Sequence, residues 1–194
     1  MMKAALEKNI TVCRLLLLPV ILIWFACTGP QLEVKPISKT ENPQELINQL
    51  DNDIALARKN QINVLAPTWF ERAESSLNAA KRGLDKGDQL SEILDNIATG
   101  RAQLDRSAEF ARVSRTTLPE AIKARTMARN AGATTLGEDY TDAEDRFIGL
   151  TRAIEDNNLG YAQRNQTRVV ERFRVLELRA IKIRTIGEVR RLIQ

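Results

Sequence analysis

The sequence predicts an all-α protein built on two related helical hairpins. Apolar residues recur at intervals of three and four in two stretches, namely Phe70, Ala73, Leu77, Ala80 and Leu84, and Tyr140, Ala143, Phe147, Leu150 and Ile154. This spacing is the apolar stripe of an amphipathic helix that packs against another helix. The two stretches are offset by 70 residues throughout, which indicates a duplicated unit. No segment shows the alternation typical of a strand.

These patterns divide the chain into segments. We expect an elongated body of two three-helix repeat units, residues 43–116 and 117–184, each containing an antiparallel, coiled-coil-like hairpin. Residues 1–27 precede it as a signal segment, and residues 28–42, which contain Pro30 and Pro36, are expected to form a flexible tether.

The signal segment begins with charged residues and continues with an apolar run from Leu15 to Ala26. Twelve residues of helix are about 18 Å long, too short for the ~30 Å hydrocarbon core of a bilayer. The segment resembles a bacterial lipoprotein signal, which implies that Cys27 carries the lipid. Cys13 would leave with the signal, so Cys27 would have no disulfide partner. Trp24 and Phe25 are unusual at such a site, and an inert cysteine or an uncleaved anchor is the alternative.

In the first unit, we expect Asn42 to cap a helix that opens at Pro43, with Glu45 completing a capping box. A second helix opens at Pro67 and ends at Gly87, and Asp88 is expected to cap the third. The third helix carries its own apolar face, which consists of Leu90, Leu94, Ile97, Leu104, Ala108 and Ala111.

The second unit is expected to repeat this order. A capping box over Thr117–Glu120 would open a short helix that ends near Asn130, and a second helix would follow Gly137. Asn157 and Asn158 would make the next turn. The last helix carries an apolar face of Val169, Phe173, Leu176, Ala180 and Ile183. Residues 185–194 repeat the Thr and Glu spacing of a capping box, and we expect them to begin a truncated, weakly packed third unit, with the natural protein continuing further.

Opposite charges on the two helices of the second hairpin favour their pairing. The helix after Gly137 carries five acidic residues near its start, and the last helix is basic, with Arg164, Arg168, Arg172, Arg174, Arg179, Lys182 and Arg184. The simpler interpretation is mutual solvation of two surface faces, each pair contributing about 0–1 kcal/mol. The alternative is that the basic residues contact an anionic glycan or lipid.

Nothing in the sequence predicts an enzyme. There is no histidine, so the commonest general base and zinc ligand is missing, and we expect no catalytic residue, metal or cofactor. The net charge is +4 for the whole chain but only +2 without residues 1–27, which argues against nucleic-acid binding. We expect Trp69, Phe70 and Tyr140 to be core residues. Glu74 and Glu144 occupy equivalent polar positions, and both are expected to tolerate Gln.

The stretch Leu65–Glu74, its echo from Tyr140 and the signal segment resemble the helical N-terminal region of proteobacterial OmpA-family envelope lipoproteins, a repeat domain of unassigned function. The resemblance covers about residues 43–194. It implies a lipid-anchored module on the periplasmic face of the outer membrane, with structural or interaction roles. A soluble periplasmic or inner-membrane-anchored protein is the alternative location. A second alternative for the function is that the chain is the N-terminal part of a longer, OmpA-like peptidoglycan-associated lipoprotein. The expected partner is an envelope protein or a peptidoglycan-associated component.

Overall fold

The computed structural model describes residues 32–193, and all of its regular secondary structure is helical, with no strand among these residues. The all-α class is therefore confirmed. By its contacts the chain divides into residues 1–32 and residues 33–194, and the fold below is that of the second unit. The predicted signal segment and Cys27 lie outside the described residues.

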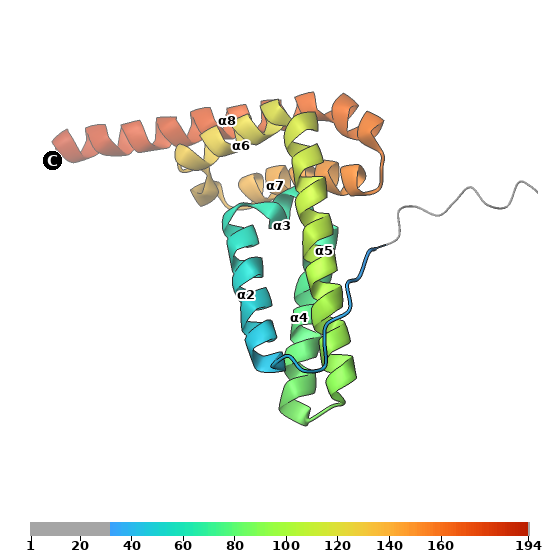
Figure 1. Cartoon of the computed structure of the whole chain (residues 1–194). Coiled ribbons are helices and arrows are strands. Elements are labelled where there is room, and N and C mark those ends of the chain that lie inside the picture. The colour runs from blue at the N-terminus through green and yellow to red at the C-terminus, as the bar shows by residue number, and fades with distance from the viewer. Residues whose placement is uncertain (1–31, 194) are drawn as a thin grey trace, which may run out of the picture. The chain divides into compact units, whose positions relative to one another are not determined.

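The first set of helices comprises α2 (Pro43–Lys59), α3 (Ile62–Leu65), α4 (Pro67–Lys86) and α5 (Leu90–Thr117). Helices α4 and α5 form a hairpin, and α2 packs along both of them (Figure 1). Their apolar faces meet in one cluster, whose buried members include Ile47, Leu50, Phe70, Leu77, Leu94 and Ile97. The periodicity of the sequence explains this cluster, because residues three and four apart share one face of a helix.

The second set comprises α6 (Pro119–Asn130), the 3-10 helix η2 (Ala133–Leu136), α7 (Glu138–Glu155) and α8 (Leu159–Ile193). These helices lie across one end of the first set, where α3 and the end of α5 join their cluster (Figure 1). The ring of Phe173 on α8 is at the centre, 6.4 Å from the ring of Phe147 and 6.1 Å from that of Tyr140. Such edge and tilted contacts suit the charge distribution of aromatic rings.

The two long hairpins turn in the same way. Gly87 and Asn157 both have left-handed backbones, with φ of 75° and 59°. Asp88 N–H bonds to the carbonyl of Gly83 (2.9 Å), and Asn158 N–H bonds to that of Ala153 (2.7 Å). Each bond closes the end of a helix in the manner of a Schellman motif. The turns predicted at Gly87 and at Asn157 are thus both present.

The predicted apolar stripes are buried, apart from Leu84, which is half-buried. The faces assigned to α5 and α8 need two corrections. Leu90 is 39% exposed because it is the first residue of α5, and Ile183 is 55% exposed because α8 has by then passed the end of the core.

Helix starts were predicted less well than helix ends. Asn42 does cap α2, accepting from the N–H of Gln44 at 3.0 Å. The N-cap of α5 is Gln89 rather than Asp88, and Thr117 is the last residue of α5 rather than the cap of α6. The short helices α3 and η2 carry no signal in the sequence, because four residues are too few to show a period.

The structure bears on the predictions for the two end segments, residues 28–42 and 185–194. Helix α8 crosses Thr185 without interruption, so the helix start predicted there is wrong. Of the expected tether, residues 33–41 contain no helix but run beside α5, where Ile37 packs against the first cluster and Glu33 and Glu41 line a small hollow with Arg101.

A candidate site at the junction of the two helix sets

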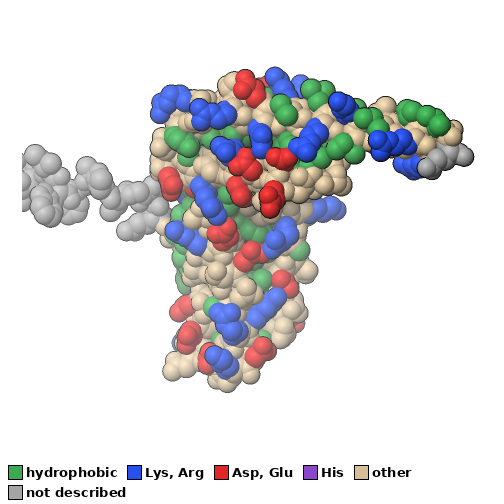
Figure 2. Space-filling model, turned by 180° about the vertical axis from the view of Figure 1, so that it is seen from behind, with side chains coloured by type: hydrophobic (Ala, Val, Ile, Leu, Met, Phe, Trp, Pro, Cys, Tyr) green, Lys and Arg blue, Asp and Glu red, His purple; other side chains and the backbone are tan. Residues whose placement is uncertain are grey.

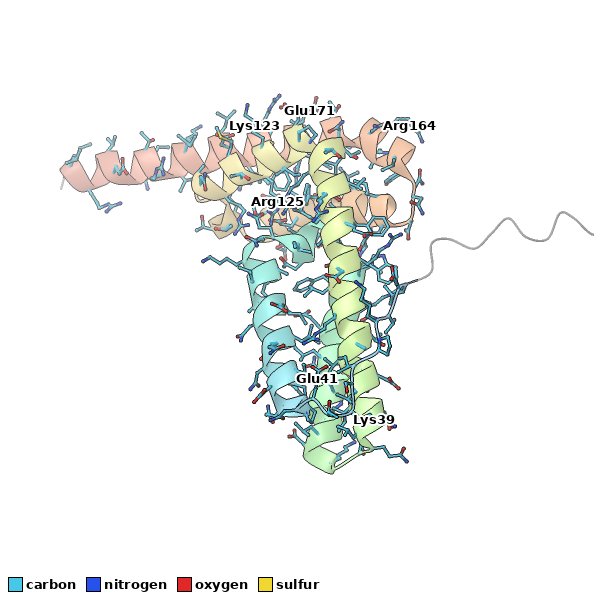
Figure 3. The ribbon with its side chains drawn as sticks, viewed as in Figure 1. Lys39, Glu41, Lys123, Arg125, Arg164 and Glu171 are labelled. Atoms are coloured by element: carbon cyan, nitrogen blue, oxygen red, sulfur yellow. The ribbon has the colours of Figure 1, made fainter. Side chains whose placement is uncertain are left out.

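A buried arginine marks the junction between the two sets of helices. Arg125 lies on α6 among three buried alanines, and its side chain is only 6% exposed. Its Nε donates to Glu144 on α7 at 2.7 Å, and its Nη1 donates to the side-chain oxygen of Gln61 at 2.6 Å. The guanidinium also lies 5.4 Å from the centre of the Phe147 ring. Figure 3 labels Arg125 at this junction. A buried charge requires such partners, because burial without them costs several kcal/mol.

Tyr140 extends this network on α7. Its hydroxyl donates to the second carboxylate oxygen of Glu144, one helical turn away. Burial of the hydroxyl, followed by the bond and the negative charge at Glu144, raises the pKa of Tyr140 far above its usual value of 10.0. The hydroxyl therefore remains a proton donor at neutral pH. Tyr140 is buried as predicted, but it is a core residue with a polar function.

Gln61 enters the network from a strained backbone. It has a φ of 62°, in the left-handed region that costs a side-chain-bearing residue roughly 1 kcal/mol or more. The residue in the corresponding turn before η2 is Gly132, with a φ of 90°, which avoids this cost. The hydrogen bond from Arg125 to the side-chain oxygen of Gln61 offsets part of this strain. Backbone strain of this kind is typical of functional positions.

Beside this network is an open hollow of about 590 Å³. It is lined by side chains from α2, α3, α6, η2 and α7. Four of them are cationic, namely Arg58, Lys59, Arg125 and Arg129, and one is anionic, Glu144. Arg58 also pairs with Glu74, outside the hollow. The residues that line the hollow thus carry an excess of positive charge.

The basic residues predicted on α8 do not share one free face. Arg172 reaches Asp139 (3.2 Å) and Asp142 (3.5 Å) on α7, and Arg179 also pairs with Asp139. Arg168 lines a shallow hollow of mixed charge with Asp142 and Arg146. No ion pair is present within residues 32–193 for Arg164, Arg168, Arg174, Lys182 or Arg184. Arg164 lies near the start of α8, far along the helix from Lys182 and Arg184 (Figure 3).

Beyond Ala180, α8 leaves the core and projects from the second helix set (Figure 1). All residues from Ile181 to Ile193 except Gly187 are exposed. Leu178 is 68% exposed, and Leu192 is 87% exposed. Seen from behind, this projection presents apolar and basic side chains next to one another (Figure 2). Large exposed apolar side chains in a row indicate a surface with a binding partner.

Sequence reasoning missed the network at Arg125. One signal was available, because Arg125 falls on the same helical face as Ala121, Ala124 and Ala128. A lone charge within an apolar stripe predicts a buried, paired group. Glu144 gave no such signal. Its equivalent Glu74 pairs with Arg58 near the surface, whereas Glu144 is 17% exposed and bound by two buried side chains. The expectation that Glu144 tolerates Gln is therefore revised.

Within the described residues, no group of three His, Cys, Asp or Glu side chains is placed to hold a metal ion. Nor does any helix from residue 32 to residue 193 combine the length and apolarity needed to span a bilayer. Comparison with known protein families, curated proteins and solved structures gave no match to this chain. The resemblance of residues 43–194 to a region of OmpA-family lipoproteins stays a prediction.

Proposed function

We propose that this chain is a non-enzymatic docking module of the bacterial cell envelope. Cys27 anchors it by lipid to the periplasmic face of the outer membrane, and the C-terminal part of α8 makes a second contact with an anionic bilayer surface. The anchor is supported by the sequence of residues 1–27. The second contact is supported by one observation, the exposed apolar and basic surface of α8 beyond Ala180.

The exposed apolar stripe of α8 is on the side opposite its buried stripe. Continuing the buried face from Ala180 by helical steps leads to Arg184, Gly187 and Arg191. Four of the exposed apolar residues follow another line, namely Leu178, Ile181, Val189 and Leu192, with Thr185 between Ile181 and Val189, at steps of three, four, four and three. We call this line the outer stripe. The outer stripe is therefore not a continuation of the core face, and Ile183, Ile186 and Ile193 expose further apolar surface on other sides of the helix.

The charges beside the outer stripe favour an anionic bilayer over a second copy of the chain. From residue 174 to residue 191 there are six cations, Arg174, Arg179, Lys182, Arg184, Arg190 and Arg191, against Glu177 and Glu188. Two such helices would repel each other if they paired. A helix with an apolar stripe and flanking Lys and Arg instead suits the interface of an anionic membrane. Lipid at Cys27 and a basic amphipathic segment would together give the two signals that stable membrane attachment requires.

We also propose that the two helix sets arose by duplication of a three-helix unit with a coiled-coil-like hairpin. The closing bonds at Gly83–Asp88 and Ala153–Asn158 are 70 positions apart, as the two apolar stripes are. In each unit the first helix is followed by a residue with a left-handed backbone and then by a short helix. These are Gln61 and α3 between α2 and α4, and Gly132 and η2 between α6 and α7. The offset at this point is 71, because the residue that ends α2 is Asn60 and the residue that ends α6 is Ala131.

Hydrogen exchange on the full chain in lipid vesicles tests the second contact. Amides of residues 181–193 should exchange more slowly in vesicles of phosphatidylcholine with phosphatidylglycerol than in phosphatidylcholine alone, and concentrated salt should remove the difference. The double variant Leu178→Gln, Leu192→Gln should lose this protection. Leu56→Gln is the matched control, because Leu56 on α2 is also an exposed leucine, at 57%.

Three results would contradict the proposal. Equal exchange in both vesicle types would exclude an anionic surface as the partner. Protection without lipid that grows with protein concentration would identify a second copy as the occupant of the outer stripe. Normal processing and acyl labelling of a Cys27→Ser variant would exclude the anchor.

A further inference from the structure

We infer that the hollow beside Arg125 is a binding site for a small phosphate-bearing anion. The site is separate from the outer stripe of α8, since it is formed by α2, α3, α6, η2 and α7. Its volume of about 590 Å³ is in the range of small-molecule sites in proteins. Nothing in the proposed docking of α8 uses it.

The residues that line the hollow carry positive charge that the protein leaves uncompensated. Arg58 pairs with Glu74, and Arg125 pairs with Glu144. Lys59 and Arg129 have no ion pair within residues 32–193, although both line the hollow. The ends of α2 and α6 together add about one negative charge, which reduces but does not cancel the excess. A phosphate monoester, with a charge of about −1.5 to −2 at pH 7, complements it.

The side chain of Arg125 is held in one orientation beside the hollow. Its Nε and Nη1 donate to Glu144 and Gln61, which fixes the plane of the guanidinium. Its Nη2 has no hydrogen-bond partner within residues 32–193, and this atom is not fully buried. That nitrogen therefore keeps some exposure to solvent, and the Arg125 side chain lines the hollow. A buried arginine held by two side chains, with a donor left over, is pre-organised to bind an oxyanion.

Neutral polar side chains also line the hollow. Asn63 and Thr134 line it with polar groups that can donate to phosphate oxygens. Tyr140 keeps its proton and directs it to Glu144, so this carboxylate is engaged by both Tyr140 and Arg125. Its repulsion of an incoming anion is reduced accordingly. The strained backbone of Gln61 positions the side chain that holds Arg125.

Calorimetric titration of the full chain, in a neutral detergent and at constant ionic strength, tests the site. The probes are inorganic phosphate, glycerol 3-phosphate and succinate, a dicarboxylate of similar charge. We expect both phosphates to bind and succinate to bind at least about tenfold more weakly, because the site is matched to a single compact anion. Tighter binding of glycerol 3-phosphate would identify lipid headgroups as the source of the phosphate, and equal or weaker binding would favour free phosphate.

The decisive variant is Lys59→Gln with Arg129→Gln. Both side chains are exposed, so the fold should persist, and circular dichroism checks this. Phosphate affinity should fall by about tenfold or more, because two charge-assisted contacts are lost. The matched control, Arg174→Gln with Lys182→Gln, removes the same charge from α8 and should bind phosphate as wild type does. Absence of phosphate binding in the millimolar range, an equal loss in both double variants, or equal affinity for succinate would each overturn the proposal.

Discussion

Glu155, the last residue of α7, caps the first turn of α4 at Trp69. Its carboxylate accepts hydrogen bonds from the backbone N–H groups of Trp69 (3.0 Å) and Thr68 (2.9 Å). Helix α4 has no side-chain cap of its own, since Ala66 occupies the cap position. The contact thus satisfies two amides of the first helix set with a side chain from the second. Nearby, the hydroxyls of Ser114 and Thr151 donate to the carbonyls of Leu65 and Val64, which fixes α3 to α5 and α7.

Replacing Glu155 with Ala should lower the free energy of unfolding by about 1–2 kcal/mol. The reason is that two partly buried N–H groups of α4 would lose their acceptor. Urea denaturation at pH 7 measures the difference. A variant that unfolds at the same urea concentration as wild type would show that water replaces the carboxylate at no cost.

The ionisation of Glu155 should give the protein a specific pH dependence. Burial raises the pKa of Glu155 above its usual 4.5, although the bonds from Trp69 and Thr68 oppose the shift. The folded state therefore binds the proton more tightly than the unfolded state, and the stability due to this group is fully present below about pH 4.5 and lost as the pH rises through the folded pKa. Relative to Glu155→Gln, wild type should lose stability as the pH rises from about 4.5 through the folded-state pKa of Glu155. Urea midpoints of both proteins across this range test the sign, and a constant difference would refute it.

Glu144→Gln should destabilise the fold far more than Glu74→Gln, although the two positions are 70 residues apart in the duplicated pattern. The first change leaves Arg125 as a buried charge without a carboxylate, which costs about 3 kcal/mol. The second removes a pair whose arginine is 55% exposed, which costs less than about 1 kcal/mol. Urea denaturation of the two single variants makes the comparison. Equal effects would show that Arg125 does not depend on Glu144.

Two glycines within helices should respond to alanine with opposite signs. At Gly100 on α5, a Cβ would lie 2.8 Å from a methyl group of Leu50, which is fully buried on α2. Gly100→Ala should therefore cost about 1–3 kcal/mol through overpacking. At Gly149 on α7, a Cβ would meet nothing within 4 Å, so Gly149→Ala should stabilise by about 0.5–1 kcal/mol. Thermal unfolding of both variants measures the two effects, and a stabilised Gly100→Ala would show that α2 can move away from α5.

The prediction of the helices succeeded where a local signal was strong. Three such signals occur on α4, namely the apolar stripe of Phe70–Leu77, Pro67 in the first turn and Gly87 with a positive φ after the last turn. Each one depends only on residues within one or two helical turns. The same signals gave no information about Asp88 and Thr117, because a capping side chain competes with neighbouring residues that extend the helix.

The sequence alone therefore determined the helical class, the positions of the long hairpins and the buried sides of α4 and α7. Only the tertiary structure decided that Glu144 is buried while Glu74 is not, that Gln61 and Arg125 meet across 64 positions, and that α8 continues past the core. The physical reason is range. Periodicity specifies which face of a helix is apolar, whereas the crossing of two helix sets determines which polar groups share one buried space and must bind one another there.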